Sequence, residues 1–191
     1  MNEGDRVWHV CGISGSLRRA SYNRAVLRAA AEMVPGGLTI DIFEGLADVP
    51  HFNRDVEAEG DPAGVAALKG AIRHADALLI ATPEYNGGVP GVLKNALDWA
   101  SRKGTDEASV LTGKPVAVMG ASPGRLGTAR AQPQLRQTLA GAGAIVMPKP
   151  EVHLMSIGGQ VTDGVLVDEA VRRVISSLVE SLAEWIPRIQ E

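Results

Sequence analysis

Two kinds of hydrophobic pattern alternate along this chain. Short runs of apolar and β-branched residues, typical of buried strands, occupy positions 7–13, 38–43, 77–81, 115–120 and 144–147. Between and after them lie longer segments in which apolar residues recur every three or four positions, as in helices with one buried face, at 23–34, 62–75, 90–102, 129–142 and about 168–185. The pattern predicts five strand–helix units.

This alternation predicts an α/β fold with a parallel sheet and helices on both of its faces. Because parallel crossovers are right-handed, the sheet is expected to be doubly wound. Residues 44–61 and 153–165 show no clear period and are predicted as loops, while Asp61 and Pro62 are predicted as the N-cap and first residue of the second helix. We expect one domain over residues 1–191, because no repeat or linker is visible.

Composition excludes several classes of protein. The 19 basic and 22 acidic residues give a net charge of −3, too balanced for a general nucleic-acid binder. The one cysteine cannot form an internal disulfide, and no apolar run reaches the roughly 18 residues needed to insert in a membrane. With no signal-peptide pattern at the start of the sequence, we expect a cytoplasmic protein.

The loop after the first predicted strand has the chemistry of an anion site. It offers short hydrogen-bonding side chains and one guanidinium, namely Ser14, Ser16, Ser21, Asn23 and Arg18. The loop precedes a helix N-terminus, where free N–H groups and the helix dipole favour a phosphate. Neither a Walker loop nor a G-x-G-x-x-G pattern is present. The alternative is that the polar residues only cap the helix and that Arg18 is a solvated surface charge.

The loop after the third predicted strand, residues 82–91, combines turn formers with an aromatic ring. Pro83 and the paired glycines at 87–88 define a turn. Tyr85 places a ring at the ligand edge of the sheet, and Asn86 offers both a donor and an acceptor. The backbone here is suited to the polar rim of a flat heterocycle. The alternative for Tyr85 is a partly buried aromatic that only packs.

The loop after the fourth predicted strand, residues 120–127, is rich in small residues that allow a ligand to approach closely. Its Arg125 faces either the phosphate of a pyridine nucleotide or solvent, and the sequence does not separate these two readings. In an open parallel sheet, loops after strands lie at the carboxyl edge, where ligands bind. The three loops are therefore expected to meet.

Two motifs resemble the NADPH-dependent FMN reductase family. Its pattern G-S-x-R-x-x-S-x-N occurs at residues 15–23, and P-E-Y-N-x-x-x-P-x-x-L-K-N-A-x-D-W occurs at residues 83–99. The resemblance covers nearly the whole chain. The family includes bacterial chromate, quinone and azo-dye reductases. It implies a flavodoxin-like fold, a five-stranded parallel sheet in the order 2-1-3-4-5, with FMN as cofactor.

The resemblance also assigns cofactor-binding residues. Those expected to bind the FMN phosphate are Ser16, Arg18, Ser21 and Asn23, and their neighbours Leu17 and Tyr22 are also expected to contact the cofactor. Those expected beside the ring or ribityl chain are Pro83, Glu84, Tyr85, Asn86, Gly87, Ser122 and Gly124. In some relatives, a Tyr in the helix after the fourth strand belongs to a hydrogen-bond network between subunits, and this chain lacks that Tyr in the region of Pro133. The same relatives have a Glu after the fifth strand, and Glu151 matches it.

The function implied by the resemblance is electron transfer from NADPH or NADH, through FMN, to a quinone, azo compound, chromate or free flavin. Donor and acceptor would use one site in turn, which predicts ping-pong kinetics, and no catalytic side chain is assigned. A homodimer or homotetramer is expected. The alternatives are a flavodoxin-type electron carrier or a redox sensor; carriers typically have a Thr-rich phosphate loop and a strongly acidic face, unlike this chain.

Other chemically suggestive residues are expected to be structural. Cys11 lies inside a strand and is predicted to be a small buried hydrophobe. The four histidines lack metal-ligand spacing, so no metal site is predicted. Asp98 and Trp99 are expected to pack on the sheet or on a second subunit, and the acidic residues at 57, 59 and 61 to be solvated.

Overall fold

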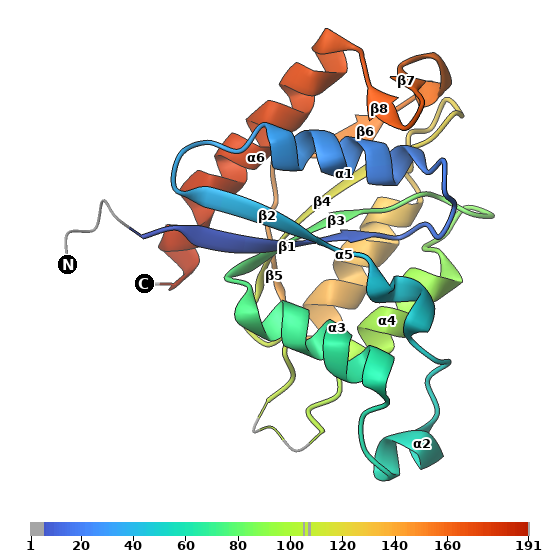
Figure 1. Ribbon diagram of the computed structural model, residues 1–191, viewed down its shortest axis with the longest axis vertical. Helices are drawn as coiled ribbons and strands as arrows, with labels where there is room; N and C mark the ends of the chain where they lie inside the picture. The colour runs from blue at the N-terminus through green and yellow to red at the C-terminus, as the bar shows by residue number, and fades with distance from the viewer. Residues whose placement is uncertain (1–5, 105, 107, 191) are drawn as a thin grey trace.

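The computed structural model describes residues 6–104, 106 and 108–190, and its centre is a parallel sheet (Figure 1). The main strands are β1 (Trp8–Ser14), β2 (Leu38–Phe43), β3 (Ala77–Ala81), β4 (Pro115–Ala121) and β5 (Ile145–Val146). Their spatial order is β2-β1-β3-β4-β5, and every neighbouring pair is parallel. This confirms the predicted fold. The central strand β3 is entirely buried, as its unbroken apolar sequence requires.

Helices cover both faces of the sheet (Figure 1). One face packs against α1 (Tyr22–Glu32) and α6 (Glu169–Gln190), and the other against α3 (Ala63–His74), α4 (Gly91–Ala100) and α5 (Ala131–Gly141). Each helix turns the apolar stripe seen in the sequence toward the sheet, which produces two separate hydrophobic cores. Helix α6 continues to Gln190, beyond the predicted end near residue 185.

The fifth strand is divided in two. Strand β5 pairs with the start of β4, and β6 (Val152–Leu154) pairs with its end, where Met119 lies opposite Val152. Between the two lie Pro148 and Pro150, which have no backbone N–H to donate to a ladder. The prediction that a loop begins at residue 153 is therefore wrong, because residues 152–154 form β6 and pair with β4.

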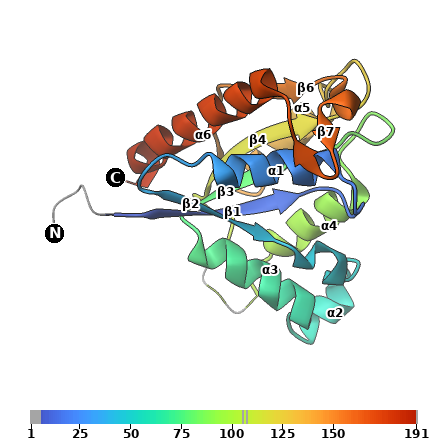
Figure 2. The same ribbon diagram turned by 45° about the horizontal axis from the view of Figure 1, so that its top comes forward.

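Short elements occupy the remaining predicted loops. Residues 44–61 contain the 3-10 turn η2 (Gly45–Asp48) and the helix α2 (Arg54–Ala58). The segment after β6 contains η3 (Ile157–Gly159) and an antiparallel hairpin of β7 (Val161–Thr162) and β8 (Val165–Leu166). Figure 2 shows this hairpin over the α1 side of the sheet, where Leu166 is buried. Two-residue strands carry no recognisable period, so the sequence does not reveal them.

The predicted N-cap of α3 is also wrong. Pro62 occupies the cap position and makes no side-chain hydrogen bond. The Asp61 carboxylate instead lies 2.8 Å from the ammonium of Lys69, whose side chain is almost fully buried. A buried ammonium needs a counter-charge, so this pairing takes precedence over capping. Glu57 is likewise not free in solvent, because it accepts a 2.7 Å hydrogen bond from Arg102.

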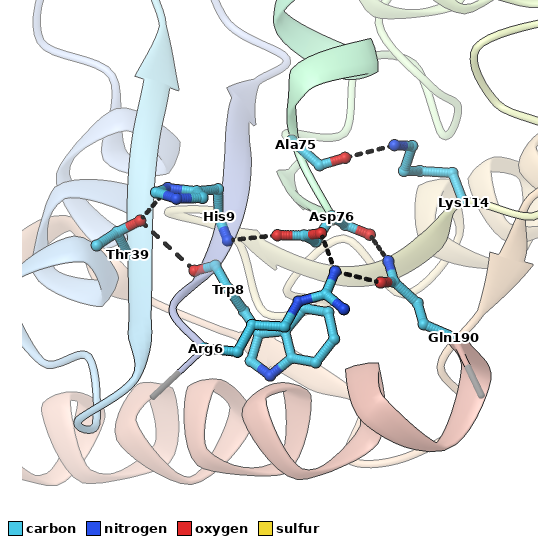
Figure 3. Close-up of polar contacts among 8 residues, drawn as sticks. All are labelled: Arg6, Trp8, His9, Thr39, Ala75, Asp76, Lys114 and Gln190. Carbon is cyan, nitrogen blue, oxygen red and sulfur yellow. Dashed lines mark hydrogen bonds and ion pairs between the residues drawn. The ribbon is translucent and has the colours of Figure 1, made fainter. Parts of the chain in front are cut away.

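At the amino ends of the strands, a polar network joins β1, β3 and the C-terminal end of α6 (Figure 3). The Asp76 carboxylate accepts hydrogen bonds from the His9 N–H (2.9 Å) and from Arg6 (3.1 Å). The Gln190 amide donates to the Asp76 carbonyl at 2.9 Å. Beside it, Lys114 donates to the Ala75 carbonyl; burial lowers the pKa of Lys114, and the charge of Asp76 opposes this effect.

Candidate functional site

The turn between β1 and α1 contributes the first part of the site. Gly15 is required there, because a Cβ atom would lie 2.9 Å from the Leu93 side chain and 3.1 Å from Pro83. Ser16 is buried, and its hydroxyl lies 3.2 Å from the Tyr85 hydroxyl. Ser21 caps α1 by accepting a 3.3 Å hydrogen bond from the Arg24 N–H. The turn thus holds two hydroxyls beside a helix N-terminus.

Several donors around this turn lack partners. Within residues 6–104, 106 and 108–190, no acceptor is found for the N–H groups of Ser16, Leu17, Arg19 and Ala20. In the same ranges, the Arg18 guanidinium has no ion-pair partner and lies 5.8 Å from the centre of the Tyr22 ring. The first turn of α1 carries no acidic residue. These donors and the helix dipole together favour a bound anion.

A cleft at the carboxyl edge brings together most of the predicted site. Its lining consists of Ser16, Arg18, Ser21, Tyr22, Asn23, Pro83, Glu84, Tyr85, Ala121, Ser122 and Pro123. The predicted residues Leu17, Asn86, Gly87 and Gly124 lie in the same loops but outside this lining. Ala121 and Pro123 were missed by the sequence interpretation, since neither has a side chain that signals ligand binding.

The Asn23 side chain is already engaged by the protein. Its amide oxygen accepts from the Ala121 N–H, and its amide nitrogen donates to the Ala121 carbonyl, both at 2.9 Å. Asn23 therefore extends the end of β4 as a neighbouring strand would, and ties it to the first turn of α1. Through this contact the residue fixes the position of the cleft wall.

The segment after β3 forms a tight two-residue turn. Tyr85 and Gly88 exchange both backbone hydrogen bonds, at 3.0 and 3.2 Å. Between them, Asn86 and Gly87 have φ values of 51° and 78°. Asn-Gly is the sequence that this left-handed turn favours, because glycine has no Cβ penalty and Asn tolerates a positive φ. The turn leaves Tyr85 47 % exposed at the mouth of the cleft.

The segment after β4 is anchored by the unpredicted strand β6 and the residues that follow it. The Ser122 N–H donates to the Leu154 carbonyl at 3.0 Å, and the Ile157 N–H donates to the Ser122 carbonyl at 3.2 Å. The Ser122 hydroxyl accepts from the Gly124 N–H at 3.0 Å. Ser122 and Gly124 are thus turn-forming partners, and Arg125 next to them is exposed.

The second half of the long motif fastens a loop to α4. Trp99 is fully buried and donates to the Pro50 carbonyl at 2.8 Å. The Asn95 amide accepts from the Phe52 N–H and donates to the same Pro50 carbonyl. Asp98 pairs with Lys94 one turn away. The expected packing role of Trp99 is therefore seen in the structure.

Other titratable groups do not form a second chemical centre. Burial, assisted by the nearby Asp41 charge, raises the pKa of the Cys11 thiol to about 12, so it stays a neutral thiol near pH 7. Hydrogen bonds from His153 and Lys149 lower the pKa of Glu151. In the described ranges, no group of three metal-binding side chains comes together. A groove of about 670 Å³ lies between β2 and α3, but its lining includes the carboxylates of Asp41 and Glu44 and none of the Ser, Arg or Tyr side chains that line the carboxyl-edge cleft.

The donor set fits a phosphate monoester attached to a flat ring. Hydroxyls, N–H groups and a guanidinium that have no acceptor within residues 6–104, 106 and 108–190 suit a dianion. The Tyr85–Gly88 turn beside them offers backbone groups and an aromatic ring. A doubly wound sheet in the order β2-β1-β3-β4-β5 with a cleft at its carboxyl edge is the architecture of the flavodoxin-like class of α/β proteins.

Comparison with known proteins gives the family. Residues 8–158 match the family described as NADPH-dependent FMN reductase. The chain is 46 % identical over 182 residues to an NAD(P)H-dependent FMN reductase of Pseudomonas aeruginosa, covering 95 % of this chain and 96 % of that protein. It is 38 % identical over 181 residues to a quinone reductase of Pseudomonas putida, covering 95 % and 96 % respectively.

A solved structure agrees with these relatives. FerB, a flavoenzyme NAD(P)H:(acceptor) oxidoreductase from Paracoccus denitrificans, superimposes with a TM-score of 0.85 at 36 % identity, over 95 % of this chain and 98 % of that chain. The present chain belongs to the NADPH-dependent FMN reductase family, and is thus a flavin-dependent oxidoreductase. Within the described ranges, none of its helices has the length and apolar character needed to cross a bilayer.

Proposed function

We propose that this protein uses FMN to pass electrons from NADPH or NADH to small acceptors, with quinones as the leading class. The observation that carries the proposal is the junction of an anion cleft and an exposed aromatic turn, joined by the 3.2 Å contact between the Ser16 and Tyr85 hydroxyls. The names of the relatives support quinones as acceptors. Azo compounds, chromate and free flavin are further candidates of the same chemical kind.

Different residues of the cleft would bind different parts of FMN. Ser16, Ser21 and the Arg18 guanidinium would bind the phosphate, together with the N–H groups of Ser16, Leu17, Arg19 and Ala20, which have no acceptor in the described ranges. The backbone of residues 83–87 would hold the ring, with Ser122 and Gly124 beside the ribityl chain. Asn23 would act by shaping the cleft through Ala121.

When bound, FMN supplies the hydride-accepting centre, and the protein's residues bind and orient it. The half-exposed Tyr85 and the exposed Leu17 leave the mouth of the cleft open to small molecules. Donor and acceptor would enter by this one mouth in turn, and no side chain is assigned as a general acid or base. The proposal therefore includes a ping-pong mechanism.

The first experiment is a visible spectrum of the purified protein, followed by identification of the released flavin. NADPH and NADH oxidation is then measured with a benzoquinone at several fixed concentrations. Parallel double-reciprocal lines are expected for alternating use of one site. Intersecting lines would contradict the ping-pong mechanism, and flavin reduced only by a partner protein would point to an electron carrier.

We also propose that a second copy of the chain packs against the rim of the cleft and completes its wall while leaving the mouth open, in a homodimer or homotetramer. Large apolar side chains are exposed on the loops of the carboxyl edge, namely Leu17, Tyr85, Leu126 and Met155. Sedimentation velocity of the wild type and of Leu126→Glu tests this. We expect the wild type to be oligomeric and the variant to dissociate more readily; a monomeric wild type would contradict the proposal.

Two simpler expectations complete the proposal. The chain would act as a single FMN-binding domain, and its place of action would be the cytoplasm. The one cysteine, which is buried and unpaired, is consistent with a reducing compartment. Cell fractionation of the native host tests the location, and a single cooperative unfolding transition of the holoprotein tests the domain count.

A further inference from the structure

The carboxylate of Glu84 is the most fully coordinated side chain around the cleft. One oxygen accepts hydrogen bonds from the backbone N–H groups of Arg130 (2.9 Å) and Ala131 (3.1 Å). The other accepts from Arg130 Nε at 2.6 Å and also pairs with the terminal guanidinium nitrogen. The Glu84 side chain is 6 % exposed, whereas that of Arg130 is 60 % exposed. Glu84 is thus buried, fixed and charge-compensated.

These contacts give α5 a cap from outside the helix. The residue before α5, Arg130, has helical backbone angles and makes no side-chain cap, and the first turn of α5 has no acidic residue. A helix N-terminus is stabilised by a carboxylate at its free N–H groups. Here that carboxylate comes from Glu84, the residue immediately before Tyr85. The hydrogen bonds that cap α5 therefore also fix the position of the turn after β3.

A second contact connects the same two elements. One helical turn after Arg130, the Gln134 amide donates to the Gly87 carbonyl at 3.1 Å. Arg130 and Gln134 are four residues apart and therefore share one face of α5. On its other side, the turn contacts Ser16 through the Tyr85 hydroxyl. A turn with two residues at positive φ is thereby held from both sides.

We propose that Glu84 and Gln134 are positioning residues, which use α5 to fix the Tyr85–Gly88 turn in the conformation that binds the flavin ring. This proposal rests on the proposed function, because the ligand of the turn is FMN. It extends that function by assigning the flavin affinity and potential in part to a helix that contributes no side chain of its own to the cleft lining. An isolated helix cap would not influence either property.

The test compares apoprotein variants that remove the contacts of Glu84 with Arg130 and Ala131 to different extents. Glu84→Ala removes the charge and all acceptors, whereas Glu84→Gln keeps an acceptor for the N–H groups of α5. The matched control is Glu57→Gln, which breaks a partly buried Glu–Arg pair between Glu57 on α2 and Arg102, two residues after the end of α4. FMN affinity is measured by quenching of flavin fluorescence, and amide hydrogen exchange of residues 84–88 is measured without FMN.

We expect FMN to bind about tenfold more weakly to Glu84→Ala and several-fold more weakly to Glu84→Gln, with no change for the control. Exchange at residues 84–88 should rise in the same order. The midpoint potential of bound FMN should become more negative, because less ordered N–H groups stabilise the reduced, negatively charged ring less well.

Two results would overturn the proposal. One is FMN affinity and potential in the Glu84 variants equal to those of Glu57→Gln. The other is faster exchange at residues 84–88 with unchanged FMN affinity, because the contact would then order the turn without contributing to flavin binding. If Glu84→Ala does not fold, Gln134→Leu is measured in its place. It should show the same changes in FMN affinity, hydrogen exchange and midpoint potential, each smaller than in Glu84→Ala. Wild-type protein that binds no FMN would instead contradict the proposed function itself.

Discussion

At the amino ends of the strands, the polar groups of this protein bind one another, whereas at the carboxyl ends several strong donors have no partner within the described part of the chain. Asp76 accepts from His9 and Arg6, and its own carbonyl accepts from Gln190 (Figure 3). At the opposite edge, the Arg18 guanidinium and the N–H groups near it lack acceptors in the described ranges. The first edge stabilises the fold; the second is arranged for a ligand.

The carboxyl edge itself contains both kinds of polar group. Glu84 and Asn23 lie in the cleft, yet their side chains are saturated by Arg130 and by Ala121 respectively. Membership of a cleft lining is therefore a weaker indication of ligand contact than a free donor. The comparison divides the predicted site into residues expected to touch FMN and residues that hold the others in place.

The largest expected effect on binding comes from Arg18→Ala. Loss of a charge-assisted contact to the phosphate should weaken FMN binding by about 10- to 100-fold, equivalent to about 1.5–3 kcal/mol. Thermal stability of the apoprotein should change little, because Arg18 has no ion-pair partner in the described ranges. The control is Arg19→Ala, the exposed neighbour outside the cleft lining. Equal FMN affinity in both variants would mean that Arg18 is a solvated charge.

The reverse result is expected at the amino edge. Asp76→Ala should lower the free energy of unfolding by about 1–2 kcal/mol, because the N–H of His9 and the guanidinium of Arg6 lose their acceptor. FMN affinity should stay within about twofold of wild type. Urea titration gives the first quantity and flavin fluorescence the second. Asp98→Asn, in an exposed pair with Lys94, is the control and should cost about 0.5 kcal/mol or less. A large loss of FMN affinity in Asp76→Ala would show that the two edges are not independent.

A smaller effect is expected on the contribution of Glu84 to the free energy of unfolding when the pH is lowered. Burial by itself acts to raise the pKa of Glu84, but the hydrogen bonds and charge of Arg130 and the Ala131 N–H outweigh it, so the pKa of Glu84 lies below the ordinary value of 4.5. A carboxyl with a depressed pKa in the folded state contributes stability above its unfolded-state pKa and loses it as the pH falls through the folded-state value.

The difference in unfolding free energy between wild type and Glu84→Gln should therefore be constant near pH 7 and shrink as the pH falls below about 4.5. Urea unfolding of both apoproteins at pH 7 and at pH 3.5 measures it. A difference that is the same at both pH values would show that the charge of Glu84 does not stabilise the contact with α5.

The smallest effect is expected at Cys11. Because its pKa is raised to about 12 and the side chain is buried, iodoacetamide at pH 8 should modify it only after unfolding. Mass spectrometry of native and urea-treated protein checks this. Cys11→Ala should leave FMN affinity unchanged, since Cys11 lies outside the cleft lining. Rapid modification of the native protein would show that the adjoining groove opens in solution.

Much of the architecture could be predicted from local pattern. Strands β1 to β4 and the five long helices are long enough for their periods to be read, and the order of strands and helices restricts the topology to a few choices. The two motifs placed most of the cleft residues. The sequence missed β6, the β7–β8 hairpin and α2, because elements of two to five residues depend on partners that are distant in the chain.

The sequence by itself determined the parallel α/β fold, the loops that meet at its carboxyl edge and the types of donor they contain. Those features follow from residue spacing and side-chain chemistry. Only the tertiary structure decided that Asp61 binds Lys69 instead of capping a helix, that Asn23 pairs with Ala121, and that Glu84 caps α5. Each polar side chain has several possible partners, and which of them it binds depends on burial and distance after the chain has folded.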